Sequence, residues 1–258
     1  MNITDFTMDF FSLKGKNAIV TGGNTGLGQA FSLALAKAGA NVMTPSIMPD
    51  DPEFNALLEA EGATAVYMSA DLTEEGVPKK IVDRCVERLG SVDILVNCAG
   101  IGLNKEFKEY SRKEWDPMVR VNLTAAFELA HEAALKMIPR ESGKIINICS
   151  LFTFLGGQWS PAYAATKHGM AGLTKSFCDE LAQYNIQVNG IAPGYFATKV
   201  TEKTRSHPEK NKWIVDHTPA GRWGDVADLM GTTVFLASQA SQFVNGHILS
   251  VDGGFLTR

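Results

Sequence analysis

The chain has 258 residues, of which 45% are hydrophobic and 20% charged, and its formal net charge is −4. This composition is typical of a globular protein, and the length fits one large domain. The negative charge offers no basic field to nucleic acid or acidic membranes, and no apolar run approaches the roughly 20 residues that cross a bilayer.

The amino-terminal arm, residues 1–15, lacks the basic region, apolar stretch and cleavage site of a signal peptide. Four cysteines are widely spaced, and three of them lie in apolar segments: Cys85, Cys98, Cys149 and Cys178. This pattern predicts buried thiols and neither a metal cluster nor a disulfide framework. We therefore expect a cytoplasmic protein without a catalytic metal.

From residue 16 onward, short β-type runs alternate with longer helical patterns. The expected strands are 17–22, 40–44, 64–70, 92–97, 143–150, 186–192 and 247–251. Most are continuous apolar runs, which are typical of strands buried on both faces of a parallel sheet. The alternation predicts a Rossmann-type, doubly wound parallel sheet of about seven strands with helices on both faces.

Neither a repeat nor a linker interrupts this order, so residues 1–258 are interpreted as a single dinucleotide-binding catalytic domain. One segment, 198–224, interrupts the alternation of strands and helices, because it is polar and contains His207-Pro208 and Thr218-Pro219. A polar segment of this kind, following a buried strand, predicts a flap over a substrate site.

The first predicted strand leads directly into the glycine-rich sequence TGGNTGLG, residues 21–28, and then into a helix. Gly22, Gly26 and Gly28 permit a tight turn and the close approach of a pyrophosphate. The helix that follows offers free N–H groups and a positive dipole end to phosphate. A glycine turn without a ligand is the alternative interpretation.

Tyr163 and Lys167 lie four residues apart in the sequence YAATK, so a helix places them on the same face. Both residue types are common on helices, and an exposed aromatic beside a solvated lysine has the same spacing. The other motifs of the chain decide whether this pair has a catalytic role.

The turn spacing G-x-x-x-G-x-G, NCAG at 97–100, Ser150 thirteen residues before Tyr163, PGYFAT at 193–198 and VDGG at 251–254 occur in one order. In these motifs the chain resembles the short-chain dehydrogenase/reductase family over nearly its whole length. Within the family, stretches such as GKIIN, PAGRWG and VFLAS are most similar to 2-dehydro-3-deoxy-D-gluconate 5-dehydrogenases and 2-deoxy-D-gluconate 3-dehydrogenases. Gluconate 5-dehydrogenases share many of these stretches.

The resemblance implies four catalytic residues: Asn122, Ser150, Tyr163 and Lys167. Tyr163 exchanges a proton with the substrate oxygen, and the Lys167 ammonium stabilises the phenolate and holds the nicotinamide ribose. Ser150 donates a hydrogen bond to the same oxygen. Asn122 orders a proton-relay water, unless it is a helix-interior asparagine that is satisfied locally.

The resemblance also implies a set of cofactor-binding residues along the strand ends. Beside Tyr163 and Lys167, the set comprises Gly22, Asn24, Thr25, Gly26, Leu27, Gly28, Ser46, Asp71, Leu72, Asn97, Ala99, Gly100, Pro193, Gly194, Phe196 and Thr198. Ser46 occupies the position where the family often has an aspartate that binds the adenosine ribose. No Lys, Arg or His lies between Lys37 and Lys79 to pair with an additional phosphate, so NAD(H) is favoured over NADP(H).

The substrate end departs from the family pattern because the pair of arginines that often follows the NAG motif is absent. A sugar-acid carboxylate needs a cation or several donors when it is desolvated. The candidates are Lys105, Gln158, Trp159, Lys199 and Arg205, none of which the sequence places in space. Arg222, in PAGRWG, is interpreted more readily as structural. His168, His207 and His217 are expected on the surface.

These observations predict an NAD(H)-dependent oxidoreductase that reversibly reduces 3-deoxy-D-glycero-2,5-hexodiulosonate to 2-dehydro-3-deoxy-D-gluconate, with Tyr163 as general acid and base. The alternatives are a dehydrogenase of gluconate or another polyol, and an inactive nucleotide-binding scaffold. The family habit is a homotetramer. The stripe Met170, Leu173, Phe177 and Leu181 is compatible with such an interface, although intramolecular packing explains it equally well.

Overall fold

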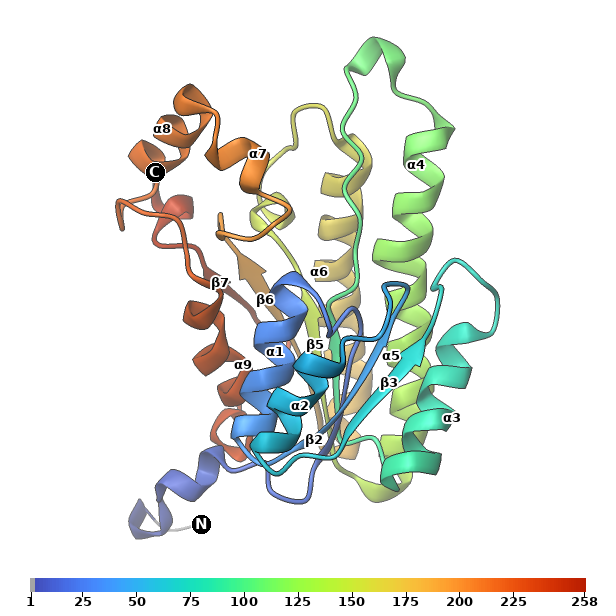
Figure 1. The fold of residues 1–258 in the computed structure, drawn as a ribbon. Coiled ribbons are helices and arrows are strands. Elements are labelled where there is room, and N and C mark those ends of the chain that lie inside the picture. The colour runs from blue at the N-terminus through green and yellow to red at the C-terminus, as the bar shows by residue number, and fades with distance from the viewer. Residues whose placement is uncertain (1–2) are drawn as a thin grey trace.

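The computed structural model describes residues 3–258 and contains a seven-stranded parallel sheet (Figure 1). The strand order is β3-β2-β1-β4-β5-β6-β7. The strands are β1 (Asn17–Val20), β2 (Asn41–Ser46), β3 (Ala65–Ser69), β4 (Ile94–Asn97), β5 (Gly143–Ile148), β6 (Ile186–Pro193) and β7 (Ile248–Val251). All seven predicted strands are confirmed, as is the doubly wound parallel sheet.

Helices cover both faces of this sheet. They are α1 (Gly26–Lys37), α2 (Pro52–Ala60), α3 (Val77–Leu89), α4 (Arg112–Val119), α5 (Ala125–Met137), α6 (Pro161–Leu181), α7 (Glu202–Arg205), α8 (Pro208–His217) and α9 (Met230–Ala237). Successive strand residues face opposite sides, which explains the two core clusters. Val20 and Val96 pack with α1, α2 and α9, whereas Ile19 and Leu95 pack with α3 and α5.

The side-chain stripe on α6 faces this interior. Met170 and Leu181 are buried, and Leu173 and Phe177 pack against buried clusters of the same chain. Intramolecular packing therefore accounts for the stripe. The predicted flap includes α7 and α8, which lie at the end of the molecule opposite the amino-terminal arm (Figure 1). Within residues 3–258, no helix has both the length and the apolar character that a bilayer crossing requires.

Candidate active site

The glycine-rich turn joins β1 to the first turn of α1. Gly22 and Gly26 adopt positive φ angles of 65° and 52°, where glycine has no steric penalty. A Cβ on Gly28 would lie 2.1 Å from the carbonyl oxygen of Gly22. The backbone of the turn thus packs too closely for a side chain at Gly28. The three glycines also place no side chain at the amino terminus of the 12-residue helix α1.

Thr21 fastens this turn to the next strand of the sheet. Its hydroxyl oxygen accepts hydrogen bonds of 3.0 Å from the backbone N–H groups of Cys98 and Ala99. The NCAG segment after β4 is therefore held against the turn after β1. The sequence analysis did not single out Thr21, although its place directly before Gly22 at a strand end was an available signal.

Asn24 lies in the turn with a 3% exposed side chain, and its Nδ2 donates to the carbonyl oxygen of Pro49 over 2.8 Å. Its Oδ1 is buried without a hydrogen-bond partner within the described residues. Ser46, the last residue of β2, is also buried, and its hydroxyl accepts from the Met48 N–H. Ile47, by contrast, is 69% exposed.

Asp71 follows β3 and caps its own turn. The hydroxyl and N–H of Thr73 donate to its carboxylate over 2.7 and 2.8 Å, and these bonds lower the pKa of Asp71. Arg120 binds the carbonyl oxygens of Thr73 and Glu74 and forms an ion pair with Glu128. Arg120 thereby connects the turn after β3 to the helices beyond it, a link that the sequence analysis missed.

Tyr163 and Lys167 lie in the first two turns of α6, as their spacing predicted. The Lys167 side chain is 5% exposed, and its Nζ donates to the Ile148 carbonyl oxygen over 2.7 Å. The same nitrogen lies 5.5 Å from the centroid of the Tyr163 ring. Because the Lys167 side chain is buried beside the phenol ring, the solvated-lysine interpretation is excluded.

Ser150 begins a short 3-10 helix at the carboxyl end of β5. Its Oγ accepts from the Phe152 N–H over 3.2 Å, which leaves the hydroxyl proton available for donation. Thr153 donates to the Lys167 carbonyl oxygen over 3.2 Å, and its Oγ1 accepts from the Ser150 N–H. The Phe152 ring meets the Tyr163 ring edge to face at 5.9 Å. These contacts connect the Ser150 turn to α6.

Asn122 lies in a single π-helical turn, Arg120–Thr124, between α4 and α5. Its side chain is 2% exposed; Nδ2 donates to the Ile101 carbonyl oxygen and Oδ1 accepts from the Ile101 N–H, each over 2.8 Å. Nδ2 also lies 3.5 Å from the Thr166 hydroxyl. Asn122 therefore holds the segment after β4 close to α6 through bonds to residues outside its own helix, and its role in a proton relay stays a prediction.

In the NCAG segment, the Asn97 side chain points into the protein interior. Asn97 is buried, and its Nδ2 donates to the Ala126 carbonyl oxygen and to Oδ1 of Asn147. Its amide nitrogen thus joins the end of β4 to α5 and β5, and the cofactor contacts expected at 97–100 stay a prediction. A Cβ on Gly100 would lie 3.3 Å from Oδ1 of Asn122.

The segment 193–198 continues from β6 and is held from both sides. Gly194 donates its N–H to the Val251 carbonyl oxygen, and Phe196 forms a parallel bridge with Gly224 while its ring packs into the core. The Thr198 N–H donates to the Thr201 hydroxyl over 3.0 Å. Pro193, Gly194, Phe196 and Thr198 consequently form one fixed strand extension.

The substrate candidates lie on two loops and the flap. Lys105 donates its backbone N–H to the Trp159 carbonyl oxygen over 2.9 Å, which brings the loops after β4 and β5 together. Trp159 has a φ angle of 65°, an unusual value for a side chain of this size. Gln158 and Lys199 are exposed, whereas Arg205 is half-buried at the end of α7.

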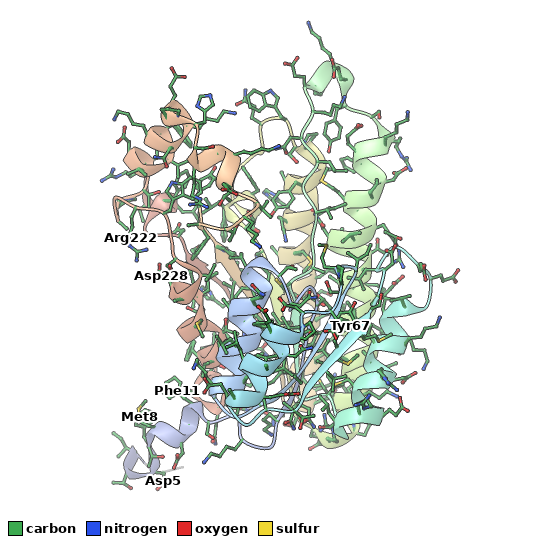
Figure 2. All side chains as sticks on the ribbon, viewed as in Figure 1. Asp5, Met8, Phe11, Tyr67, Arg222 and Asp228 are labelled. Atoms are coloured by element: carbon green, nitrogen blue, oxygen red, sulfur yellow. The ribbon has the colours of Figure 1, made fainter. Side chains whose placement is uncertain are left out.

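Several other residues lie where the sequence analysis expected them. Arg222 forms a two-point ion pair with Asp228, at 2.7 and 3.1 Å, and Figure 2 shows both on the side of α8 and α9. His168 is exposed and contacts the Ala164 carbonyl oxygen.

Burial raises the pKa of the Cys98 thiol to about 12, which makes it an inert group beside the site.

The geometry agrees with comparisons to known proteins. The chain matches the short chain dehydrogenase family over residues 16–209. An uncharacterized oxidoreductase of Escherichia coli (strain K12) is 63% identical over 100% of this chain and 98% of its own length. A 2-dehydro-3-deoxy-D-gluconate 5-dehydrogenase of Bacillus subtilis (strain 168) is 46% identical over 97% and 98%.

Among solved structures, a putative 2-deoxy-D-gluconate 3-dehydrogenase from Agrobacterium tumefaciens with bound NADP is similar at a TM-score of 0.90. It shares 42% sequence identity, with 96% of this chain and 99% of that chain covered. The chain belongs to the short chain dehydrogenase family, whose members use a nicotinamide cofactor.

Proposed function

We propose that the strand ends around β1 and β4 bind a nicotinamide dinucleotide. The backbone cradle of Gly22 and Gly28 fits a pyrophosphate, and the unpartnered Oδ1 of Asn24 fits a ribose hydroxyl donor. We assign the contacts to Gly22, Asn24, Thr25, Gly26, Leu27, Gly28, Ser46, Asp71, Leu72, Asn97, Ala99, Gly100, Tyr163, Lys167, Pro193, Gly194, Phe196 and Thr198. When bound, the nicotinamide supplies or accepts a hydride.

Tyr163 is the general acid and base of the proposed reaction. Its phenol donates a proton to the carbonyl oxygen in reduction and takes one from the alcohol in oxidation. The buried Lys167 ammonium, 5.5 Å from the ring centroid, supports the phenolate form of this mechanism. Ser150 donates a hydrogen bond from its hydroxyl to the same oxygen and keeps its proton, and Asn122 orders a relay water beside α6.

The substrate that we propose is a keto-deoxy sugar acid. The enzyme would interconvert 3-deoxy-D-glycero-2,5-hexodiulosonate and 2-dehydro-3-deoxy-D-gluconate. The Bacillus subtilis relative supports this assignment because it is similar over the full length of both chains. The second candidate is a dehydrogenase of gluconate or another polyol, which the 41% identity to a 5-keto-D-gluconate 5-reductase of Escherichia coli (strain K12) favours. An inactive scaffold is disfavoured because it has no use for a buried Lys167 beside Tyr163.

The observation that carries the proposal is the buried Lys167–Tyr163 pair next to the Ser150 turn. The experiment is a panel of keto-sugar acids, aldonates and neutral polyols, followed by nicotinamide absorbance in both directions. The keto-deoxy sugar acid should give the highest kcat/KM. Faster turnover of gluconate would favour the second candidate, and inactivity on the whole panel would contradict both.

We propose NAD(H) as the preferred cofactor because no cation lies in the sequence between Lys37 and Lys79. An additional ribose phosphate would be desolvated without a partner there. Ile47 follows the assigned contact residue Ser46 and is exposed, so a cation introduced there would be accessible to such a phosphate, whereas the Ser46 side chain is buried. Replacement of Ile47 with Lys should narrow the ratio of kcat/KM for NADH over NADPH. A parent enzyme that prefers NADPH would contradict the proposal.

The remaining assignments concern the whole molecule. We propose a single catalytic domain, with residues 1–15 as an arm and 198–224 as the substrate flap, that assembles as a homotetramer. The four free cysteines suit a reducing compartment, so we place the protein in the cytoplasm. A small-molecule substrate is the expected partner, without nucleic acid, membrane or catalytic metal. Sedimentation showing a stable monomer at micromolar concentration would contradict the tetramer.

A further inference from the structure

Arg205 is a guanidinium group in the flap whose hydrogen-bonding capacity is only partly used. It ends α7, and its Nη2 donates to the Thr198 carbonyl oxygen over 3.1 Å. Its Nε is buried and has no hydrogen-bond partner among residues 3–258. An N–H group that is shielded from water and unpaired is unfavourable unless another molecule supplies an acceptor.

Three other arginines of the chain form an ion pair with a carboxylate. Arg120 pairs with Glu128, Arg140 with Asp93 and Arg222 with Asp228. Arg205 forms no ion pair within the part of the chain that the structure describes. Its positive charge is therefore uncompensated, although its position is fixed by Thr198.

The other two cations of the substrate candidates are less suited to a carboxylate. The Lys105 Nζ already pairs with Glu109 at 3.3 Å, and Lys199 is exposed on the surface. A lysine also presents a single point charge. A guanidinium presents two parallel N–H donors that match the two oxygens of a carboxylate.

The place of Arg205 in the fold brings it to the substrate side. Thr198, which it binds, ends the strand extension that follows β6, at the carboxyl edge of the sheet. The Ser150 turn follows the neighbouring strand β5 at the same edge. We propose that Arg205 binds the carboxylate of the substrate and determines the preference for sugar acids over neutral sugars. This inference rests on the proposed function and assigns the acidic group of its substrate to one residue.

The test compares the sugar acid of highest kcat/KM with its methyl ester, which removes the charge and keeps the carbon chain. Arg205→Met should lower kcat/KM for the acid by roughly 10- to 100-fold, the range expected for a charged hydrogen bond. The effect should lie mainly in KM, and the ester should change by less than about threefold. Arg205→Lys should keep part of the preference for the acid over the ester, since lysine retains the positive charge but lacks the two parallel N–H donors of a guanidinium.

Lys203→Met is the matched control because Lys203 is an exposed cation on the same helix. It should leave the acid-to-ester ratio unchanged, and NADH binding should be retained in all three variants. Equal losses with acid and ester in Arg205→Met would assign Arg205 to holding the flap and overturn the inference. If the parent enzyme is active on sugar acids and Arg205→Met keeps the same acid-to-ester ratio of kcat/KM, the inference is overturned and the proposed function stands. A parent active only on neutral substrates overturns the proposed function with it.

Discussion

The strand-end frame and the loops around its opening are built by different kinds of contact. In the frame, buried side chains bind the backbone of distant segments. Thr21 holds residues 98–99, Asn122 holds Ile101, and Lys167 holds Ile148. Each bond joins two strand ends or a strand end to a helix. Such bonds fix the positions that acid–base chemistry requires.

The loops at the opening have fewer long-range bonds and more exposed apolar side chains. The partly or fully exposed apolar residues there are Ile101, Leu103, Phe107, Phe154, Leu155, Trp159, Val200 and Trp213. Two bonds join the loops, Lys105 N–H to the Trp159 carbonyl oxygen and Ser160 Oγ to the Leu103 carbonyl oxygen. We therefore expect the reaction type to depend on the frame and the choice of substrate to depend on the loops.

Removal of the proton donor from the frame should have the largest effect. Tyr163→Phe keeps the ring contact with Phe152 and deletes only the hydroxyl. We expect kcat to fall at least ~100-fold, the usual size of a general acid–base contribution, with NADH binding nearly unchanged. Steady-state kinetics and cofactor titration measure both. Tyr184→Phe, at a partly buried tyrosine in the 3-10 turn after α6, is the control. Near-normal turnover in Tyr163→Phe would remove Tyr163 from its role.

Disturbance of the glycine turn should have the next largest effect. In Gly28→Ala, the new methyl group would lie 2.1 Å from the Gly22 carbonyl oxygen, so the turn must shift. We expect a loss of unfolding free energy at the upper end of ~1–3 kcal/mol, together with weaker cofactor binding. Gly172→Ala is the matched control, because it is exposed in α6 with nothing near its Cβ. That change should stabilise by ~0.5–1 kcal/mol.

A buried lysine at the amino end of β5, the edge of the sheet opposite the frame, makes the stability of the fold depend on pH. Burial lowers the pKa of Lys144 to about 8, and its Nζ has a 3.3 Å bond to Ser241. The unfolded chain, with the ordinary value of 10.5, binds more protons between pH 8 and 10.5. The stability contribution of Lys144 should therefore rise with pH through this window.

Lys144→Met removes the buried charge and should raise the unfolding free energy at pH 7 by roughly 1–2 kcal/mol. The gain should shrink as the pH approaches 10.5. Denaturant unfolding of parent and variant at several pH values between 7 and 10.5 measures the difference. A constant difference across this range would show that Lys144 is not the titrating group.

The smallest expected effect lies in the loops. Trp159 adopts a φ angle of 65°, which favours glycine, so Trp159→Gly should stabilise the fold by about 0.5–1 kcal/mol. If the indole also contacts substrate, KM should rise while the melting temperature increases. Trp159→Ala removes the same ring without relieving the backbone and should show no gain in stability. Equal melting temperatures for the two variants would argue against backbone strain.

Much of the architecture followed from local sequence patterns. Continuous apolar runs between helical segments predicted all seven strands of the parallel sheet, because a strand buried on both faces has no polar side. The spacing of Tyr163 and Lys167 predicted their common helix face, since residues four apart on a helix are neighbours. The glycine turn was recognisable because its conformation excludes side chains.

The tertiary structure decided which polar groups meet across long stretches of sequence. Only the folded chain shows that Asn122 binds Ile101 and that Thr21 binds residues 98–99. It also shows that Arg222 has a carboxylate partner, whereas Arg205 has none among residues 3–258. Residue types and their periodicity are local properties, and they can be read directly from the amino-acid sequence. Hydrogen bonds between residues dozens of positions apart depend on strand order and loop path, because these determine which buried donor reaches which acceptor.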